Sequence, residues 1–310
     1  MTSSKVTRAI AFLFFIVVFF SACDDKDDHA NEPTIPENVV PGTWTSKSDF
    51  PTTDAVSESF SINQKGYFLL NSPSSNFWQY DPATDSWSQK TDFPGTPQVG
   101  FAIGFLGYAL KFVNEFWEYD PALNAWTRKA DYPGFISPNF GFSIGQFGYL
   151  TSGMSDSELW EWSQATDSWT QKADFPEAPR RTEAGFCIGT KVYIGGGTSG
   201  GYFDDFWEWN KSTNTWTQMA DLPGGLRAHA MGFAINQKGY LGLGGVANVY
   251  KNDLYEYNPS TNAWHQKADL PSAGRHWPAA FVIGTKAYVG MGQDSTFQSR
   301  KDIWEFDPFN

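Results

Sequence analysis

The sequence predicts an all-β chain that closes into a six-bladed propeller. Three observations lead to this prediction. The segment FWEYDPALNAW at residues 116–126 returns as FWQYDPATDSW, LWEWSQATDSW, FWEWNKSTNTW and LYEYNPSTNAW, and in a shorter copy, IWEFDPFN, at 303–310. Tryptophans at 44, 87, 126, 169, 216 and 264 recur every 39 to 48 residues, a period typical of propellers and solenoids. The 29 glycines and 18 prolines indicate many turns.

Residues 1–22 are predicted to be a lipoprotein-type signal peptide. Lys5 and Arg8 precede an apolar run too short to span a bilayer and of the length expected for a secretory signal. FSAC at residues 20–23 resembles the lipobox of bacterial lipoproteins, in which cleavage exposes the cysteine, here Cys23, for acylation. An ordinary signal peptide cut nearby is the alternative. Several acyl chains would make the anchoring stable.

Residues 23–41 are predicted to be an acidic flexible tether. They carry many charges and prolines and almost no large apolar side chain, so they cannot form a core. With the lipid anchor at Cys23, they lead us to expect an exported protein of a bacterial cell envelope, at the outer membrane or the cell surface. Inner-membrane retention stays open, because the acidic residues after the cysteine resemble opposite sorting signals in different bacteria.

Residues 42–310 are predicted to form a single propeller domain. Each period contains four short runs separated by turn residues, which predicts four strands, here called D, A, B and C in chain order. Segments such as INQKGY form the A-to-B hairpin turn, and DPATDS or NPSTNA forms the C-to-D turn. Tryptophans of strands C and D are assigned to packing between the blades.

The repeat resembles the kelch motif, with glycines after strand B, an aromatic residue in strand C and a tryptophan opening strand D. The resemblance covers residues 44–310, although the glycine pair is intact only in the fourth and fifth copies, at Gly195–Gly197 and Gly244–Gly245. It implies a kelch-type six-bladed propeller. Kelch-like galactose oxidases are disfavoured, since no residues here match their cysteine, tyrosine and histidine set; Cys187 is expected to be a buried small residue of strand A.

The two ends of the propeller are complementary. The segment at residues 42–51, GTWTSKSDFP, is a strand D that no strands A, B and C precede. The final strands A, B and C, in turn, are not followed by a strand D. We therefore predict that the N-terminal strand closes the last blade, which removes an exposed sheet edge.

Composition limits the partners of the chain. Its net charge of −12 makes nucleic acid a poor candidate. The sequence has no nucleotide-binding glycine loop, no metal-ligand spacing and no serine nucleophile elbow, so neither cofactor nor metal is expected. We expect a monomer whose partner is a carbohydrate or a protein, with the membrane contacted only through the lipid.

The candidate binding site lies in the loops of blades four to six, on the face where D-to-A and B-to-C loops emerge. The B-to-C loops are longer here, and PEAPRRTEAGF, PGGLRAHAMGF and PSAGRHWPAAF align without gaps. A planar guanidinium group suits carboxylates and phosphates, and an exposed tryptophan can stack on a sugar. The predicted ligand-binding residues are Arg180, Arg181, Glu183, Arg227, His229, Arg275, His276, Trp277 and Arg300. The alternative is that the arginines only brace the scaffold.

Two classes of function follow. The first, preferred, is a membrane-tethered binding module for a carbohydrate, an anionic ligand or a protein. The second is a sugar mutarotase, because the kelch propellers include a periplasmic sialic-acid mutarotase. In that case, Glu183 or His229 would move the anomeric proton while arginines hold the substrate carboxylate.

Overall fold

The computed structural model describes residues 41–310 apart from 72–74, 135–137, 154–155 and 182. The predicted signal peptide, Cys23 and all but the last residue of the predicted tether lie outside the described residues. Within the described part, no helix is long and apolar enough to cross a membrane. Its regular structure is β-strand, in six four-stranded antiparallel sheets and two short two-stranded sheets.

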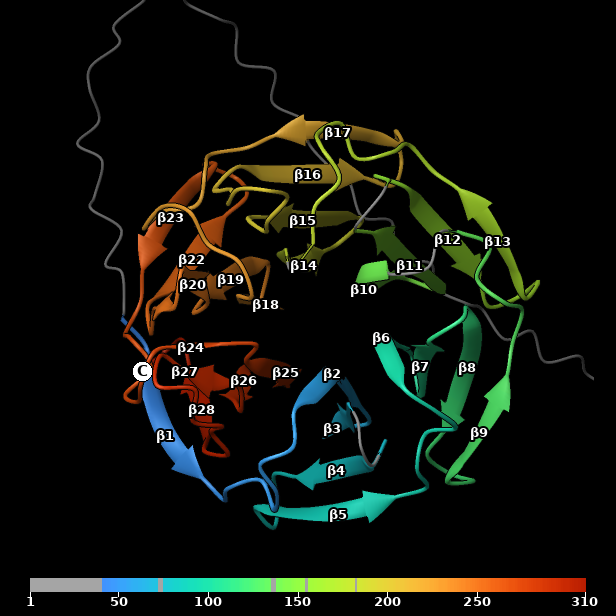
Figure 1. The fold of residues 1–310 in the computed structure, drawn as a ribbon, viewed down its shortest axis with the longest axis horizontal. Helices are drawn as coiled ribbons and strands as arrows, with labels where there is room; N and C mark the ends of the chain where they lie inside the picture. The colour runs from blue at the N-terminus through green and yellow to red at the C-terminus, as the bar shows by residue number, and fades with distance from the viewer. Residues whose placement is uncertain (1–40, 72–74, 135–137, 154–155, 182) are drawn as a thin grey trace, which may run out of the picture. The chain divides into compact units, whose positions relative to one another are not determined.

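The six sheets are the blades of the predicted propeller, arranged around a central axis (Figure 1). Blades 1 to 3 each run from the innermost to the outermost strand in chain order. Blade 1 consists of β2 (Val56–Ile62), β3 (Lys65–Leu70), β4 (Phe77–Asp81) and β5 (Ser86–Lys90). Blade 2 consists of β6 (Pro97–Ile103), β7 (Leu106–Lys111), β8 (Glu115–Asp120) and β9 (Ala125–Arg128). Blade 3 consists of β10 (Pro138–Ile144), β11 (Phe147–Ser152), β12 (Leu159–Ser163) and β13 (Ser168–Gln171).

Blades 4 to 6 repeat this order, and the loops of blades 5 and 6 contain additional short strands. Blade 4 consists of β14 (Ala184–Ile188), β15 (Lys191–Gly195), β16 (Phe206–Asn210) and β17 (Thr215–Gln218). Blade 5 consists of β18 (Met231–Ile235), β19 (Lys238–Gly242), β22 (Leu254–Asn258) and β23 (Ala263–Gln266). Blade 6 consists of β25 (Ala279–Ile283), β26 (Lys286–Gly290), β28 (Ile303–Asp307) and, from the other end of the chain, β1 (Thr43–Lys47).

The predicted closure is confirmed, because β1 pairs antiparallel with β28 over five residues. In each blade, the indole N–H of the strand D tryptophan donates to a carbonyl of the preceding blade. Trp44 continues this series by donating to Ala268 O at 2.8 Å, and its ring lies 4.8 Å from that of Phe306. The equivalent bonds run from Trp87, Trp126, Trp169, Trp216 and Trp264. The N-terminal strand thus makes the same contact between blades as its internal counterparts.

Hydrogen bonds and ion pairs between polar side chains join neighbouring strands within each of blades 2 to 6. The strand B tyrosine donates its hydroxyl to a strand C glutamate, as from Tyr193 to Glu208 at 2.7 Å. In four of these blades a lysine at or just after the end of strand D forms an ion pair with the same glutamate, and in blade 6 this lysine is Lys47 of β1. Buried polar groups need such partners, since an unpaired one destabilises the fold.

Strand A differs between the two halves of the ring. In blades 1 to 3 it is seven residues long and its pairing with strand B is interrupted by a bulge. In blades 4 to 6 it is five residues long and regular. A bulge places an extra residue in the strand and redirects its side chains. The inner wall of the propeller is therefore built differently on its two sides.

Candidate functional site

The site is a cavity at the centre of the ring. Its volume is about 750 Å³, within the size range of small-molecule pockets, and residues from the innermost strand of every blade line it. The D-to-A loops of blades 1 and 4 to 6 and the B-to-C loop of blade 6 contribute to its rim. Because only a closed ring encloses this space, the cavity depends on the pairing of β1 with β28.

The three aligned arginines are buried and paired inside their own blades. Arg227 is 1% exposed, and its two terminal nitrogens each lie 3.0 Å from a carboxylate oxygen of Asp253. It also donates to the carbonyl of Pro223 at 2.8 Å. Arg275 makes the same forked contact with Asp302, at 2.8 and 2.9 Å. These contacts support the alternative scaffold role, in which the guanidinium groups brace the loops.

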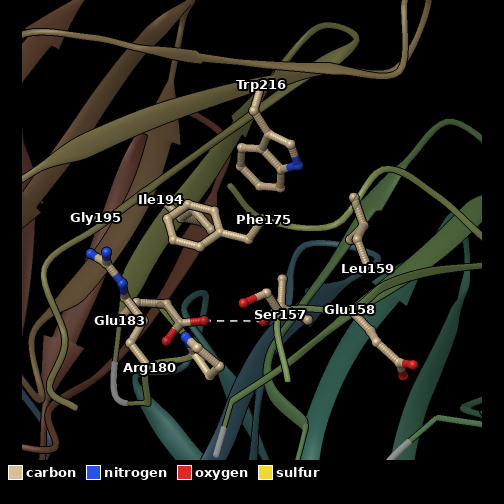
Figure 2. A pocket seen from close by; sticks show the side chains of 11 residues that line it. Ser157, Glu158, Leu159, Phe175, Arg180, Glu183, Ile194, Gly195 and Trp216 are labelled. Atoms are coloured by element: carbon tan, nitrogen blue, oxygen red, sulfur yellow. Dashed lines mark hydrogen bonds between the residues drawn. The ribbon is translucent and has the colours of Figure 1, made fainter. Parts of the chain in front are cut away.

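Arg180 follows the same pattern, with further packing. Both of its terminal nitrogens donate to Asp205, and its guanidinium group lies 4.0 Å from the ring centre of Phe203 and 4.9 Å from that of Phe175. Beside it is a space of about 10 Å³, the size of one water molecule. Figure 2 shows Arg180 and Glu183 on one side of this space and Glu158 and Leu159 on the other.

The sequence contains a signal for these pairs that the alignment of the arginines does not reveal. Asp205, Asp253 and Asp302 stand immediately before strand C in the three blades that have the arginine. Blades 1 to 3 lack the arginine and have Asn76, Glu115 and Glu158 at the same position. The joint occurrence of arginine and aspartate predicts an ion pair in each of these blades. We therefore leave Arg180, Arg227 and Arg275 out of the candidate site.

The other predicted residues of this half-face gather near the rim. His229, Trp277, Arg300 and Glu183 all line the cavity. His276 is buried behind the rim, 4% exposed, with its ring centre 4.2 Å from that of Trp277. Arg181 is exposed, and its backbone pairs with Thr198 of the neighbouring B-to-C loop. Arg300 donates through Nε to Asp294 at 2.8 Å, so its charge already has a partner.

Trp277 is held in place at the rim although its side chain is 55% exposed. Its backbone N–H donates to His229 O at 3.1 Å, and the imidazoles of His229 and His276 meet its indole at angles of 80° and 62°. Gly292, at a φ of +83°, provides the close approach that the carbonyls of His276 and Trp277 require. A large aromatic ring is therefore fixed in an exposed position.

The backbone at this tryptophan is strained. Trp277 has a φ of +53°, a left-handed conformation that is unusual for a bulky residue, and it precedes Pro278, which disfavours it further. His229 occupies the equivalent position of the previous blade at +55°. Strained residues persist only where the surroundings enforce them, and they cluster at ligand sites.

Two titratable groups of the cavity have unusual environments. Burial lowers the pKa of His229 to about 4, and the positive charges of His276 and Arg181 act in the same direction, so this imidazole is neutral at neutral pH. Burial raises the pKa of Glu58 on β2 well above its usual range, against a hydrogen bond from the backbone of Gly100. Glu58 was not among the predicted site residues, because its place on the cavity wall follows only from ring closure.

Cys187 is the small residue of strand A that the sequence predicts, and it is half-buried. It packs against the apolar cluster that contains Tyr149 and Trp209, and it also lines the cavity. Burial raises the pKa of its thiol. In the described part of the chain, no three His, Cys, Asp or Glu side chains lie close enough together to hold a metal ion.

Comparison with known proteins agrees with this architecture. The family model described as the KLHDC2/KLHL20/DRC7 Kelch-repeats domain matches residues 139–310. Among solved structures, one titled "Structure of YjhT" is similar with a TM-score of 0.72 at 15% identity, over 83% of this chain and 96% of that one. No curated protein matches the sequence.

Proposed function

The chain belongs to the kelch-repeat family, whose propellers generally serve as binding scaffolds, and from this premise we propose that it binds a carbohydrate at the mouth of its central cavity. The observation that carries the proposal is Trp277, at the rim of a cavity of about 750 Å³. Its indole is exposed and its backbone has a strained, left-handed conformation. Indole rings stack on the apolar face of sugars, while polar groups fix the hydroxyls. Glu183 and Gln98 supply such polar groups on the wall.

A protein partner is the other class to consider, since kelch propellers typically bind proteins. The concave, enclosed shape of the site favours a small ligand, because protein interfaces of standard size are broad surfaces of about 800 Å² on each partner. A peptide segment entering the cavity is therefore an outcome of the binding test and not the proposal.

The test is a glycan screen followed by calorimetry with the sugars that bind. Replacing Trp277 with alanine should weaken binding about tenfold or more, which corresponds to about 1.4 kcal/mol, and leave the melting temperature unchanged. Phe105→Ala is the matched control, because Phe105 is 73% exposed in the turn between β6 and β7, at the opposite end of the blade. Equal affinities of wild type and the Trp277 variant would contradict the proposal.

A mutarotase is the second candidate, because Glu183 and His229 line the same cavity. A neutral imidazole can accept a proton, which a base at the anomeric hydroxyl requires. The arginines expected to hold the substrate carboxylate are instead paired with aspartates. Measuring anomeric exchange by NMR, with and without protein, separates the two functions: binding without faster exchange leaves only the binding module.

We also propose that Cys23 anchors the protein to the cell envelope, as its lipobox-like context predicts. Metabolic labelling with a radioactive fatty acid should mark the wild-type protein and not the Cys23→Ser variant. Equal labelling of both would show that this cysteine is not the acylated residue.

A further inference from the structure

The cavity is larger than one sugar unit requires. A hexose has twelve non-hydrogen atoms, so even at the share of about 30 Å³ that a water molecule has in the liquid it fills about 360 Å³. The cavity holds about 750 Å³. Its lining on β14 runs from Ala184 to Cys187, which at about 3.3 Å per residue gives a depth of about 10 Å along this strand. A ring stacked on Trp277 at the mouth therefore leaves room for a second ring inside.

Aromatic side chains also continue outward from the mouth, over the loops of blades 4 to 6. The ring centre of His276 lies 4.2 Å from that of Trp277 and 4.2 Å from that of Tyr250, in the B-to-C loop of blade 5. Tyr250 is next to Tyr202 of the B-to-C loop of blade 4, because burial and this neighbouring tyrosine raise the pKa of Tyr250. The hydroxyl of Tyr202 accepts a hydrogen bond from the backbone N–H of Ala247 at 3.5 Å. We call Tyr202 and Tyr250 the outer tyrosines.

The outer tyrosines and Trp277 form an accessible aromatic surface. Tyr202 is 38% exposed and Tyr250 is half-buried. His276, which contacts both Tyr250 and Trp277, is 4% exposed, so it supports this surface without forming it. Phenol rings, like indole, combine an apolar face with a polar edge, which suits stacking on a sugar whose hydroxyls bond to neighbouring groups.

Short strands hold this surface in place before a ligand binds. In blade 5, β21 (Val249–Tyr250) pairs with β20 (Gly245–Val246), and in blade 6, β24 (Arg275–His276) pairs with β27 (Gln293–Asp294). Each pair contains one of the contacting aromatic residues. A surface that is ordered in advance loses little conformational freedom on binding, which favours affinity.

On these grounds, and resting on the carbohydrate site proposed above, we infer that the protein binds an oligosaccharide of three or more units in preference to a single sugar. One ring stacks on Trp277, its inner neighbour occupies the cavity, and the outer units lie over the outer tyrosines. The chain therefore leaves the mouth over blades 5 and 4. Each further unit adds contacts to a chain that is already held, so affinity rises with the number of units.

The first experiment measures how affinity depends on chain length. The glycan screen contains gluco-, galacto-, manno- and xylo-oligosaccharides of one to five units, and every series with a member that binds is measured by calorimetry. Within such a series, the trisaccharide should bind at least about tenfold more tightly than the monosaccharide. A monosaccharide that binds as tightly as the trisaccharide in every series would overturn the inference.

The second experiment replaces an outer tyrosine. Tyr202→Ala should weaken binding of the tetrasaccharide and the pentasaccharide several-fold and leave the disaccharide unaffected, because only the longer chains extend to this residue. Tyr202→Phe keeps the ring and should keep the affinity. Trp277→Ala, in contrast, should weaken binding at every length. Melting temperatures equal to that of wild type would show that the three variants are folded.

The matched control is Phe112→Ala. Phe112 is 54% exposed between β7 and β8 of blade 2, on the same face of the ring but in its other half. This variant should bind chains of every length like wild type. Weaker binding of long chains by Phe112→Ala, together with unchanged binding by Tyr202→Ala, would mean that the chain leaves the mouth over the other half, against the inference.

The outcomes separate this inference from the proposal on which it rests. Equal affinity at all chain lengths, or a Tyr202→Ala variant that binds long chains like wild type, would overturn the oligosaccharide inference while the carbohydrate site stands. Failure of chains of every length to bind, together with a negative glycan screen, would overturn the carbohydrate site and this inference with it.

Discussion

Glu58 shows at the scale of one residue how the closed ring changes the chemistry of a side chain. It is half-buried on the cavity wall, and burial raises its pKa well above the usual range. In the unfolded chain the same carboxyl loses its proton near pH 4.3. The folded protein therefore keeps a proton that the unfolded chain releases.

This difference predicts a pH dependence of stability. Below the unfolded pKa, Glu58 is protonated in both states and contributes nothing. As pH rises above it, only the unfolded chain releases the proton, so unfolding becomes easier until the folded pKa is passed. Glu58→Gln removes the titration, so this variant should gain stability relative to wild type between pH 5 and pH 8. Urea unfolding at both pH values measures the difference, and a constant difference would contradict the raised pKa.

Single residues also show where sequence reasoning reached its limit. The alignment of Arg180, Arg227 and Arg275 was recognised from the sequence. Taken alone, however, an aligned arginine does not show whether it binds a ligand or forms an ion pair that stabilises a loop. The aspartates that stand just before strand C of the same blades distinguish the two roles. Trp277 was identified because it breaks the packing pattern, and its exposure agrees with that interpretation. The site role of the remaining rim residues stays a prediction.

At the scale of elements, the arginine and aspartate pairs join the D-to-A loop to the start of strand C. Arg227 is 1% exposed and is held by Asp253 and two carbonyls. Arg227→Ala should therefore lower the free energy of unfolding by about 3 kcal/mol, the lower end of the range for breaking a buried pair, because the carboxylate of Asp253 that loses its partner is 15% exposed. Chemical denaturation measures the loss.

The control for this substitution is another arginine that also bonds both oxygens of one aspartate. Arg128 contacts both oxygens of Asp131, but its side chain is 51% exposed, so Arg128→Ala should cost no more than about 1 kcal/mol. If Arg227→Ala unfolds like wild type and loses sugar affinity, the arginine belongs to the ligand site and not to the scaffold.

Most strands were predictable because the same pattern of apolar and turn residues occurs in all six copies of the repeat. Alternating aromatic residues set strand C, and the turn residues separate it from strand D. The bulges of β2, β6 and β10 were not predicted, because no particular residue type marks an extra residue in these strands. The short strands β20 (Gly245–Val246), β21 (Val249–Tyr250), β24 (Arg275–His276) and β27 (Gln293–Asp294) were missed as well, because two-residue pairs depend on loop geometry.

At the scale of the whole molecule, closure of the ring creates the site. The cavity is lined by strand A of all six blades, and their arrangement is fixed only when blade 6 receives its fourth strand. The N-terminal segment supplies β1, and just after it Phe50, which is fully buried against Phe68 and Trp87 of blade 1. This short segment at one end of the chain therefore joins blade 6 to its neighbours on both sides.

Deleting residues 42–52 should open the ring. The deletion removes the pairing of β1 with β28, the bond from Trp44 to Ala268 and the core position of Phe50. It also exposes β28 as an unprotected edge, which favours pairing between molecules. The truncated chain should melt at a lower temperature, elute as oligomers and lose sugar binding, because the cavity wall is no longer held. Deleting residues 24–38 removes more of the chain but leaves β1 in place, so it should change none of these. An unchanged melting temperature and a monomeric profile after the first deletion would mean that blade 6 is stable with three strands.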